Sequence, residues 1–251
     1  MIPGAFCKPL VFDKFRARFE ARGYVVHTPP LRLHDGKATW ALGTTSLLDF
    51  AADLEKFVRA LDTPPILLGH SMGGLLAQML AARLDVRAAI LLAPSAPWGI
   101  MPSTVFEVAS AGTMFLAGDF WNQPLIPDYF IASTNSLDRL SEKECRATFA
   151  EFVPESGLAT FEIMHWPFDA RQAARVPARD IECPLLCIAG SDDRINPPKT
   201  VRSIAGRYGA LATYKEYENH SHWLVGEPGW RKIADDALDW LDTVLAAKVK
   251  S

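Results

Sequence analysis

Hydrophobic residues near the N-terminus switch between helical spacing and a short unbroken run. Phe12, Phe15 and Phe19 fall on one helical face, and Gly23 stands where the C-terminal cap of that helix belongs. The residues that follow, Tyr24–His27, predict a short buried strand. Helix and strand therefore begin to alternate at the start of the chain.

The alternation continues up to residue 96. A second helix is predicted to begin near Ser46, because Asp49 follows it at capping-box spacing. Ile66–Leu68 and Ala88–Leu92 have the continuous apolar character of buried strands, and Gly74–Leu84 between them has a helical pattern. Strands and helices that alternate on short connections indicate a mostly parallel sheet with helices on both faces.

This pattern is interrupted in the middle of the chain. Residues 97–180 contain no comparable strand run, helical patches such as Leu137–Phe152 are separated by prolines, and Glu155–Gly157 is typical of a turn. We therefore predict an α/β core formed by residues 1–96 and 181–251, with residues 97–180 as a helical insertion. The core pattern returns in two strands and a final helix: Pro184–Ala189, Ala212–Tyr217 and Pro228–Lys248.

Composition and charge exclude several classes of protein. Of the 251 residues, 49% are hydrophobic and 22% charged, which suits a sizeable core and not a disordered chain. A net charge of −3 without a basic block argues against a nucleic-acid partner. Prolines break the longest charge-free stretches, Thr63–Ala82 and Ala88–Phe106, so we expect no membrane span. Four cysteines and the absence of a signal-peptide pattern predict reduced thiols and a cytoplasmic protein.

A candidate nucleophile lies between the strand Ile66–Leu68 and the helix Gly74–Leu84. Residues Gly69–Gly73 have the pattern G-x-S-x-G, with Ser71 at its centre. A sharp strand-to-helix turn strains the serine backbone, requires small neighbours and presents the hydroxyl beside a helix N-terminus. The alternative is an ordinary glycine-rich turn in which Ser71 only caps the helix.

The sequence GHSMGG after an apolar strand resembles the nucleophile elbow of the α/β-hydrolase fold family. The order of elbow, helical insertion, late acid and late histidine is similar to that family over nearly the whole chain. The resemblance implies an α/β-hydrolase fold in which residues 97–180 form a cap over the site. It also implies a Ser–His–Asp or Ser–His–Glu hydrolase of esters, amides, thioesters or certain C–C bonds, with no metal or cofactor.

The acid of such a triad is expected after the strand Pro184–Ala189. A serine hydroxyl needs an imidazole to take its proton, and a carboxylate orients that imidazole. The family pattern G-x-x-D-x-x-x-P is similar to Gly190, Asp193 and Pro197, which favours Asp193 as the acid. Asp192 is the alternative, although an aspartate at that position also suits a turn.

The base is expected in the loop after the last strand. In the family the catalytic histidine often precedes an apolar or aromatic residue, and His222 before Trp223 matches this pattern. His220 is the alternative base, and the two histidines lack the neighbouring ligands of a metal site. His70, within the elbow, is expected to pack beneath the site, and His34–Asp35 is expected to stabilise its own loop.

Two backbone N–H donors should stabilise the negative charge that develops on a substrate carbonyl oxygen. The residue after the nucleophile, Met72, supplies one of them. The family usually has His-Gly-x in the loop that supplies the other, and Pro3–Ala5 is similar, so Ala5 is the expected donor and Phe6 the alternative. Proline in place of histidine removes an imidazole and an N–H upstream of these donors.

The start of the chain departs from the family pattern. The family has two strands and most of a third before the oxyanion loop, whereas only Met1 and Ile2 precede it here. The third strand would lie between Tyr24–His27 and Ile66–Leu68, where its loss leaves backbone groups unpaired. We therefore expect N-terminal strands to be missing and the chain to begin late relative to the natural gene product.

These observations predict a serine hydrolase that cleaves a carboxylic ester of a small, apolar acyl substrate through Ser71, His222 and Asp193. The alternatives are a C–C bond hydrolase or hydroxynitrile-lyase-like enzyme of the same fold, and a catalytically silent ligand-binding protein. The sequence indicates no oligomeric state. Aromatic residues of the insertion could line an apolar pocket, although most are expected to pack it onto the core. They are Trp98, Phe106, Phe115, Phe120, Trp121, Phe130, Phe149, Trp166 and Phe168.

Overall fold

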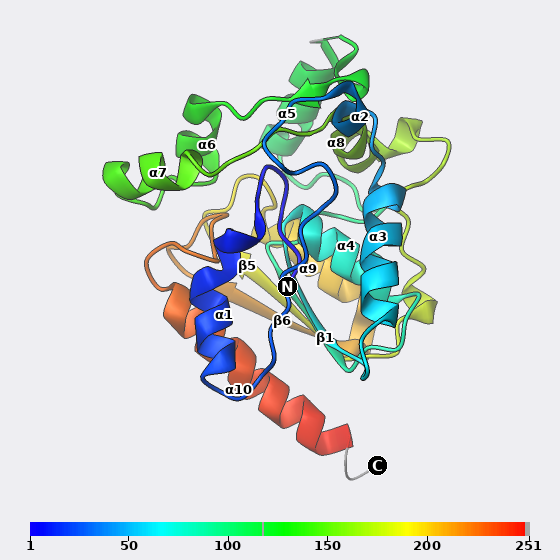
Figure 1. Ribbon diagram of the computed structural model, residues 1–251, viewed down its shortest axis with the longest axis vertical. Helices are drawn as coiled ribbons and strands as arrows, with labels where there is room; N and C mark the ends of the chain where they lie inside the picture. The colour runs from blue at the N-terminus through cyan, green and yellow to red at the C-terminus, as the bar shows by residue number, and fades with distance from the viewer. Residues whose placement is uncertain (117, 249–251) are drawn as a thin grey trace.

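The computed structural model describes residues 1–116 and 118–248, and a parallel β-sheet lies at its centre (Figure 1). The strands of this sheet are β1 (Ile66–His70), β2 (Ala88–Leu92), β5 (Leu185–Gly190) and β6 (Ala212–Tyr217). They run in the order β1-β2-β5-β6, and every neighbouring pair is parallel. The mostly parallel sheet predicted from the alternating pattern is therefore confirmed.

Helices cover both faces of this sheet. They are α1 (Asp13–Glu20), α3 (Leu47–Arg59), α4 (Met72–Ala81), α9 (Pro198–Tyr208) and α10 (Trp230–Lys248). Ala89 and Leu91 of β2 pack into the apolar cluster that contains α3, α4 and α9. Ile90 and Leu92 pack into the opposite cluster, which contains α1 and α10. This alternation is the geometry of a strand that is buried on both sides.

The first residues of the chain lie beside β1. Ile2 forms a parallel bridge with Gly69, in which the Ile2 N–H donates to Leu68 O at 2.7 Å. The Ile2 carbonyl accepts from the His70 N–H at 3.2 Å. Ile2 thus pairs with β1 on the side where the family resemblance places a third strand.

The buried strand predicted at Tyr24–His27 is wrong. This segment has no strand pairing, and its Val25 side chain is 83% exposed. The Met1 amino group donates to His27 O at 2.6 Å, but one such bond does not make a ladder. The apolar residues of Tyr24–His27 therefore lie along the edge of the core and do not cross it.

Local sequence signals place the helix ends correctly. The capping box at Ser46 is confirmed: the Ser46 N–H donates to Asp49 Oδ2 at 2.9 Å, and the Ser46 hydroxyl caps α3. The α1 helix buries Phe15 and Phe19, and Gly23 beyond it has a φ of +86°. Such a left-handed conformation favours glycine after a helix.

The segment 97–180 is mainly helical, and its helices gather at one end of the molecule together with α2 (Trp40–Gly43) (Figure 1). Its helices are α5 (Val105–Leu116), α6 (Tyr129–Asn135), α7 (Glu142–Phe149) and α8 (Gly157–Met164). Among the described residues, no helix combines the length and apolar character needed to cross a membrane. The role of this insertion as a cap stays a prediction.

The turn predicted at Glu155–Gly157 is wrong. Glu155–Ser156 forms β4, which pairs antiparallel with β3 (Pro124–Leu125), and Gly157 begins α8. A Cβ atom at Gly157 would lie 1.9 Å from Phe120 O, so the glycine permits a close backbone approach. The Glu155 side chain is completely buried, which a surface turn would not explain.

Candidate active site

Ser71 lies at the turn between β1 and α4. Its φ of +53° is in the left-handed region, which costs a residue with a Cβ atom about 1–3 kcal/mol. The turn also needs glycines: a Cβ atom at Gly69 would lie 2.1 Å from Gly73 O, and one at Gly73 would lie 2.1 Å from Ile2 O. The Ser71 N–H donates to Leu92 O at 3.0 Å. These constraints are the ones expected of a nucleophile elbow.

The structure brings together His222 and Asp193 from different loops. His222 Nδ1 lies 2.8 Å from Asp193 Oδ2, and both side chains are buried. The other carboxylate oxygen, Oδ1, accepts the N–H groups of Ile195 at 2.8 Å and Asn196 at 3.0 Å. With a carboxylate at Nδ1, the proton of the neutral imidazole sits on that nitrogen. Nε2 is then free to accept a proton.

His70 connects the elbow to the histidine loop. Its ring centroid lies 4.9 Å from that of His222, and its Nε2–H donates to His222 O at 2.8 Å. Burial, reinforced by the charge of His222, lowers the pKa of His70 to about 3. His70 is therefore a neutral packing residue, as predicted. It directly precedes Ser71, so its hydrogen bond ties the His222 backbone to the elbow.

The second-choice acid and base have other partners. Asp192 forms an ion pair with Arg139 and accepts a hydrogen bond from the Ser191 hydroxyl at 3.0 Å. His220 Nδ1–H donates to Glu218 O at 2.8 Å. Of the four residues considered for acid and base, the structure pairs only Asp193 with His222.

The N-terminal loop lies directly against the elbow. A Cβ atom on Gly4 would lie 3.0 Å from Ser71 Cβ, so the backbone of this loop passes beside the serine side chain. Ala5 follows in the same loop, and Met72 is the first residue of α4. Within the described residues, neither of these two N–H groups has a protein acceptor.

The alternative donor, Phe6, has another partner. Its N–H donates to Glu155 Oε2 at 3.0 Å, and its φ of +63° lies in the left-handed region. This leaves Ala5 as the candidate donor from the N-terminal loop, and Met72 as the candidate donor from the elbow.

The insertion contacts three loops near the candidate site: the N-terminal loop, the histidine loop and the acid loop. Glu155 accepts the Phe6 N–H, and Asp138 Oδ1 accepts the Ser221 hydroxyl at 2.6 Å. The ion pair formed by Arg139 reaches the acid loop. Sequence reasoning missed Asp138 and Arg139, and it assigned Glu155 to a turn. No local pattern signals contacts between residues so far apart along the chain.

The aromatic residues of the insertion divide between packed and exposed side chains. Phe120 is buried, with ring centroids at 5.5 Å from Trp121 and 6.3 Å from Phe161. The Phe115 side chain lies outside the described parts of the structure. Three others are exposed: Phe106, Phe130 and Phe168. Packing thus accounts for part of the aromatic content, and an apolar pocket stays a prediction.

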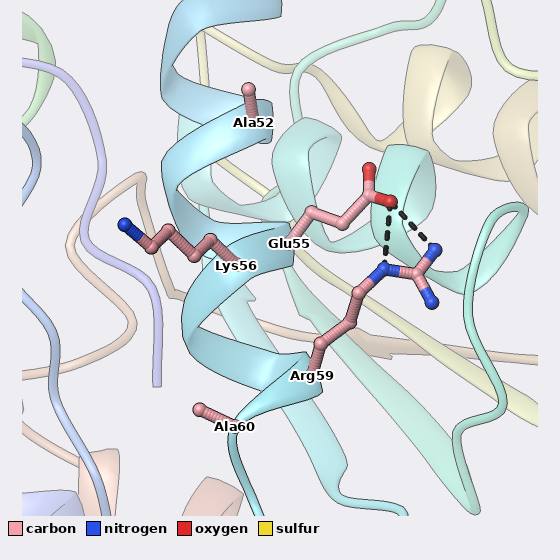
Figure 2. A pocket seen from close by; sticks show the side chains of 5 residues that line it. All are labelled: Ala52, Glu55, Lys56, Arg59 and Ala60. Atoms are coloured by element: carbon pink, nitrogen blue, oxygen red, sulfur yellow. Dashed lines mark hydrogen bonds and ion pairs between the residues drawn. The ribbon is translucent and has the colours of Figure 1, made fainter.

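Two surface hollows lie beside α3, away from the loops of the candidate site. One runs along the helix, where Glu55 and Arg59 form an ion pair (Figure 2). The other lies at the end of α3 and the connection to β1. The first hollow is lined by Ala52, Glu55, Lys56, Arg59 and Ala60.

In residues 1–116 and 118–248, no three His, Cys, Asp or Glu side chains are grouped to hold a metal ion.

Comparison with known proteins places this geometry in a family. A family model described as "Alpha/beta hydrolase family" matches residues 1–235. The chain belongs to the α/β-hydrolase family. The family resemblance of the sequence and its fold are therefore both confirmed. No curated protein sequence matches this hydrolase.

Solved structures of enzymes share the fold of this α/β-hydrolase at low sequence identity. A monoacylglycerol lipase from Paleococcus ferrophilus is 22% identical, with a TM-score of 0.67, over 97% of this chain and 93% of that one. A pyrethroid hydrolase from Sphingobium faniae JZ-2 is 20% identical, with a TM-score of 0.67, over 96% and 95%. A methylesterase from Arabidopsis is 12% identical, with a TM-score of 0.71, over 96% and 98%.

The stability of this hydrolase is expected to depend on Glu227, a buried carboxylate next to the histidine loop. Both of its oxygens accept the Ser221 N–H, at 3.1 and 3.2 Å. Burial raises the pKa of Glu227 to about 7, assisted by the charges of Asp138 and Asp193 and opposed by the Ser221 hydrogen bond and His222. Between pH 4.5 and 7 the folded state retains a proton that the unfolded chain releases. The free energy of unfolding therefore falls as pH rises, by at most about 3 kcal/mol from this group.

The Glu227→Gln variant isolates this contribution, because glutamine keeps an acceptor for the Ser221 N–H and does not titrate. Urea unfolding of both proteins at pH 5 and pH 7.5 is the measurement. We expect the stability of the variant relative to wild type to increase from the lower to the higher pH. An equal difference at both pH values would contradict the raised pKa.

Proposed function

We propose that this α/β-hydrolase cleaves carboxylic esters through a Ser71–His222–Asp193 triad and an acyl-enzyme intermediate. The observation that carries the proposal is the 2.8 Å contact between His222 Nδ1 and Asp193 Oδ2. His222 lies on a loop that a hydrogen bond from His70 ties to the strained turn of Ser71. An imidazole that a carboxylate orients is the base that makes a serine hydroxyl nucleophilic.

In the first half of the reaction, Ser71 Oγ attacks the carbonyl carbon of the ester while His222 Nε2 takes the hydroxyl proton. Asp193 stabilises the imidazolium that forms. The N–H groups of Met72 and Ala5 donate to the oxyanion of the tetrahedral intermediate. His222 then donates its proton to the departing alkoxide, and the alcohol leaves an ester on Ser71.

In the second half, water takes the place of the alcohol. His222 removes a proton from the water as it attacks the acyl carbon, and a second tetrahedral intermediate forms on the same oxyanion donors. Its collapse returns the proton to Ser71 Oγ and releases the carboxylic acid. No oxidant, reductant or metal ion enters the atom balance of this cycle.

The proposed substrate is a small ester with an apolar acyl or alkyl group. Two of the similar structures are named for ester cleavage, as a lipase and a methylesterase. The insertion contacts the N-terminal loop, the histidine loop and the acid loop, which suits a cap that excludes water from the reacting atoms. Its aromatic side chains supply apolar surface for an acyl chain.

A fluorophosphonate probe and a series of nitrophenyl esters test this function. We expect stoichiometric labelling of wild type, with the adduct located on the peptide that contains Ser71 by mass spectrometry. Each added acyl methylene that becomes buried is worth about 0.8 kcal/mol, so kcat/KM should rise about threefold to fourfold per methylene until the pocket is full. A folded wild type that neither reacts with the probe nor cleaves any ester would instead favour the ligand-binding alternative.

A further inference from the structure

A buried carboxylate of the insertion reaches into the loop that carries the proposed oxyanion donor. Glu155 Oε2 accepts the Phe6 N–H at 3.0 Å and lies 3.0 Å from His34 Nε2. Its other oxygen, Oε1, accepts the Ser156 N–H at 2.6 Å. The side chains of Glu155 and His34 are both 0% exposed. Sequence reasoning assigned His34 to a pair with Asp35, but its partner is Glu155, far along the chain.

The hydrogen bonds of His34 define its charge. Nε2 faces the Glu155 carboxylate, and Nδ1 faces Arg32 O at 2.9 Å, so both ring nitrogens lie against acceptors. An imidazole donates from both nitrogens only when it is protonated. Burial opposes that charge, but the hydrogen bond and the attraction to Glu155 outweigh burial and raise the pKa of His34. His34 and Glu155 therefore form a buried ion pair.

The backbone that this ion pair holds is strained. Phe6 has a φ of +63°, a conformation that a phenylalanine keeps only when its surroundings impose it. The insertion binds Phe6 from both sides: Glu155 accepts its N–H, and the Val153 N–H donates to its carbonyl at 2.9 Å. The Phe6 N–H and the Ala5 carbonyl belong to one peptide group, so anchoring Phe6 fixes one of the two peptide groups that flank Ala5.

We propose that Glu155 and His34 are positioning residues, which hold the loop of residues 4–6 so that the Ala5 N–H faces the oxyanion formed at Ser71. The Glu155 carboxylate accepts the Phe6 N–H, so this N–H points away from the oxyanion. Because the carboxylate belongs to the insertion, a completed oxyanion hole requires the insertion to be docked on the core. This inference rests on the proposed function, since it concerns the donors of that reaction.

The Glu155→Met variant tests the role of the carboxylate, because methionine has a similar length and volume but cannot hold the Phe6 N–H. We expect kcat/KM for a nitrophenyl ester to fall about 10²-fold, the scale of losing one oxyanion donor, with KM within about threefold of wild type. A trifluoromethyl ketone, which forms a tetrahedral oxyanion on Ser71, should bind more weakly by the same factor. Glu155→Gln keeps one acceptor oxygen and should lose only about tenfold.

Glu162→Met is the matched control. Glu162 is the other buried carboxylate of the insertion, and it accepts the Ser46 hydroxyl and the Leu47 N–H, both at 2.7 Å, at the start of α3. We expect this variant to lower the melting temperature while kcat/KM of the folded protein stays within about threefold of wild type.

Each outcome decides the role of Glu155. Wild-type activity in a folded Glu155→Met, or in Glu155→Gln if the methionine variant does not fold, overturns the positioning role. An equal loss of kcat/KM in Glu162→Met overturns it as well, because the effect would then be one of general stability. Wild type is assayed first with the fluorophosphonate probe. If wild type fails to react and to cleave esters, the proposed function fails, and this inference fails with it.

Discussion

Replacing Ser71 with alanine is expected to lower kcat for ester hydrolysis by about 10⁵- to 10⁶-fold and to abolish labelling by a fluorophosphonate. The physical reason is the loss of the only group that forms the covalent intermediate in the proposed cycle. Stability should change little, because alanine keeps the Cβ atom and therefore the same strain at a φ of +53°. Steady-state rates and intact-protein mass spectra, with thermal unfolding as the check on folding, measure these effects.

Ser203→Ala is a suitable control for the nucleophile. Ser203 is an exposed residue of α9 whose hydroxyl donates to Lys199 O at 3.0 Å. This variant should label and turn over like wild type. If Ser71→Ala retains more than about 1% of wild-type kcat in a folded protein, Ser71 is not the nucleophile.

Replacing His222 with alanine is expected to reduce kcat by about 10⁴- to 10⁶-fold, because no other base then accepts the Ser71 proton. The contact with Asp193 at 2.8 Å makes His222 the oriented imidazole of the pair. The matched substitution His220→Ala removes a histidine two positions away whose Nδ1–H is bonded to Glu218 O. We expect its kcat to remain within about tenfold of wild type.

The two histidine variants together decide the base. Both should be compared at the same pH, with melting temperatures, because His222 is buried and its removal leaves a cavity. Loss of activity in His220→Ala with activity retained in His222→Ala would exchange the two roles. Equal, severe losses in two folded variants would mean that both imidazoles take part in proton transfer.

Local signals explain which parts of the fold could be predicted from sequence. The capping box of Ser46 and Asp49 depends on residues three positions apart, and the elbow at Ser71 depends on glycines within two positions. The unbroken apolar runs of β1 and β2 are buried on both faces, so their pattern reports their environment directly. Such short-range patterns can be recognised without knowledge of the tertiary structure.

The errors arose where distant residues determine the local structure. Tyr24–His27 has the composition of a strand, but a strand also requires a neighbour to pair with, and the sequence does not supply that information locally. The turn prediction at Glu155–Gly157 rests on serine and glycine, which favour turns. The burial of Glu155 depends on His34 and Phe6, which lie more than a hundred residues earlier in the chain. The pairing of His222 with Asp193 was inferred through family resemblance rather than local pattern.

The contacts between the insertion and the site loops have a consequence for protein engineering. A chimera that replaces residues 97–180 with a segment from another family member would keep Ser71, His222 and Asp193. It would nevertheless discard Asp138, Arg139 and Glu155, which bond to the three loops of the core. Recombination that retains these junction residues and diversifies the exposed side chains of α5 and α6 preserves these contacts while changing the outer surface of the insertion.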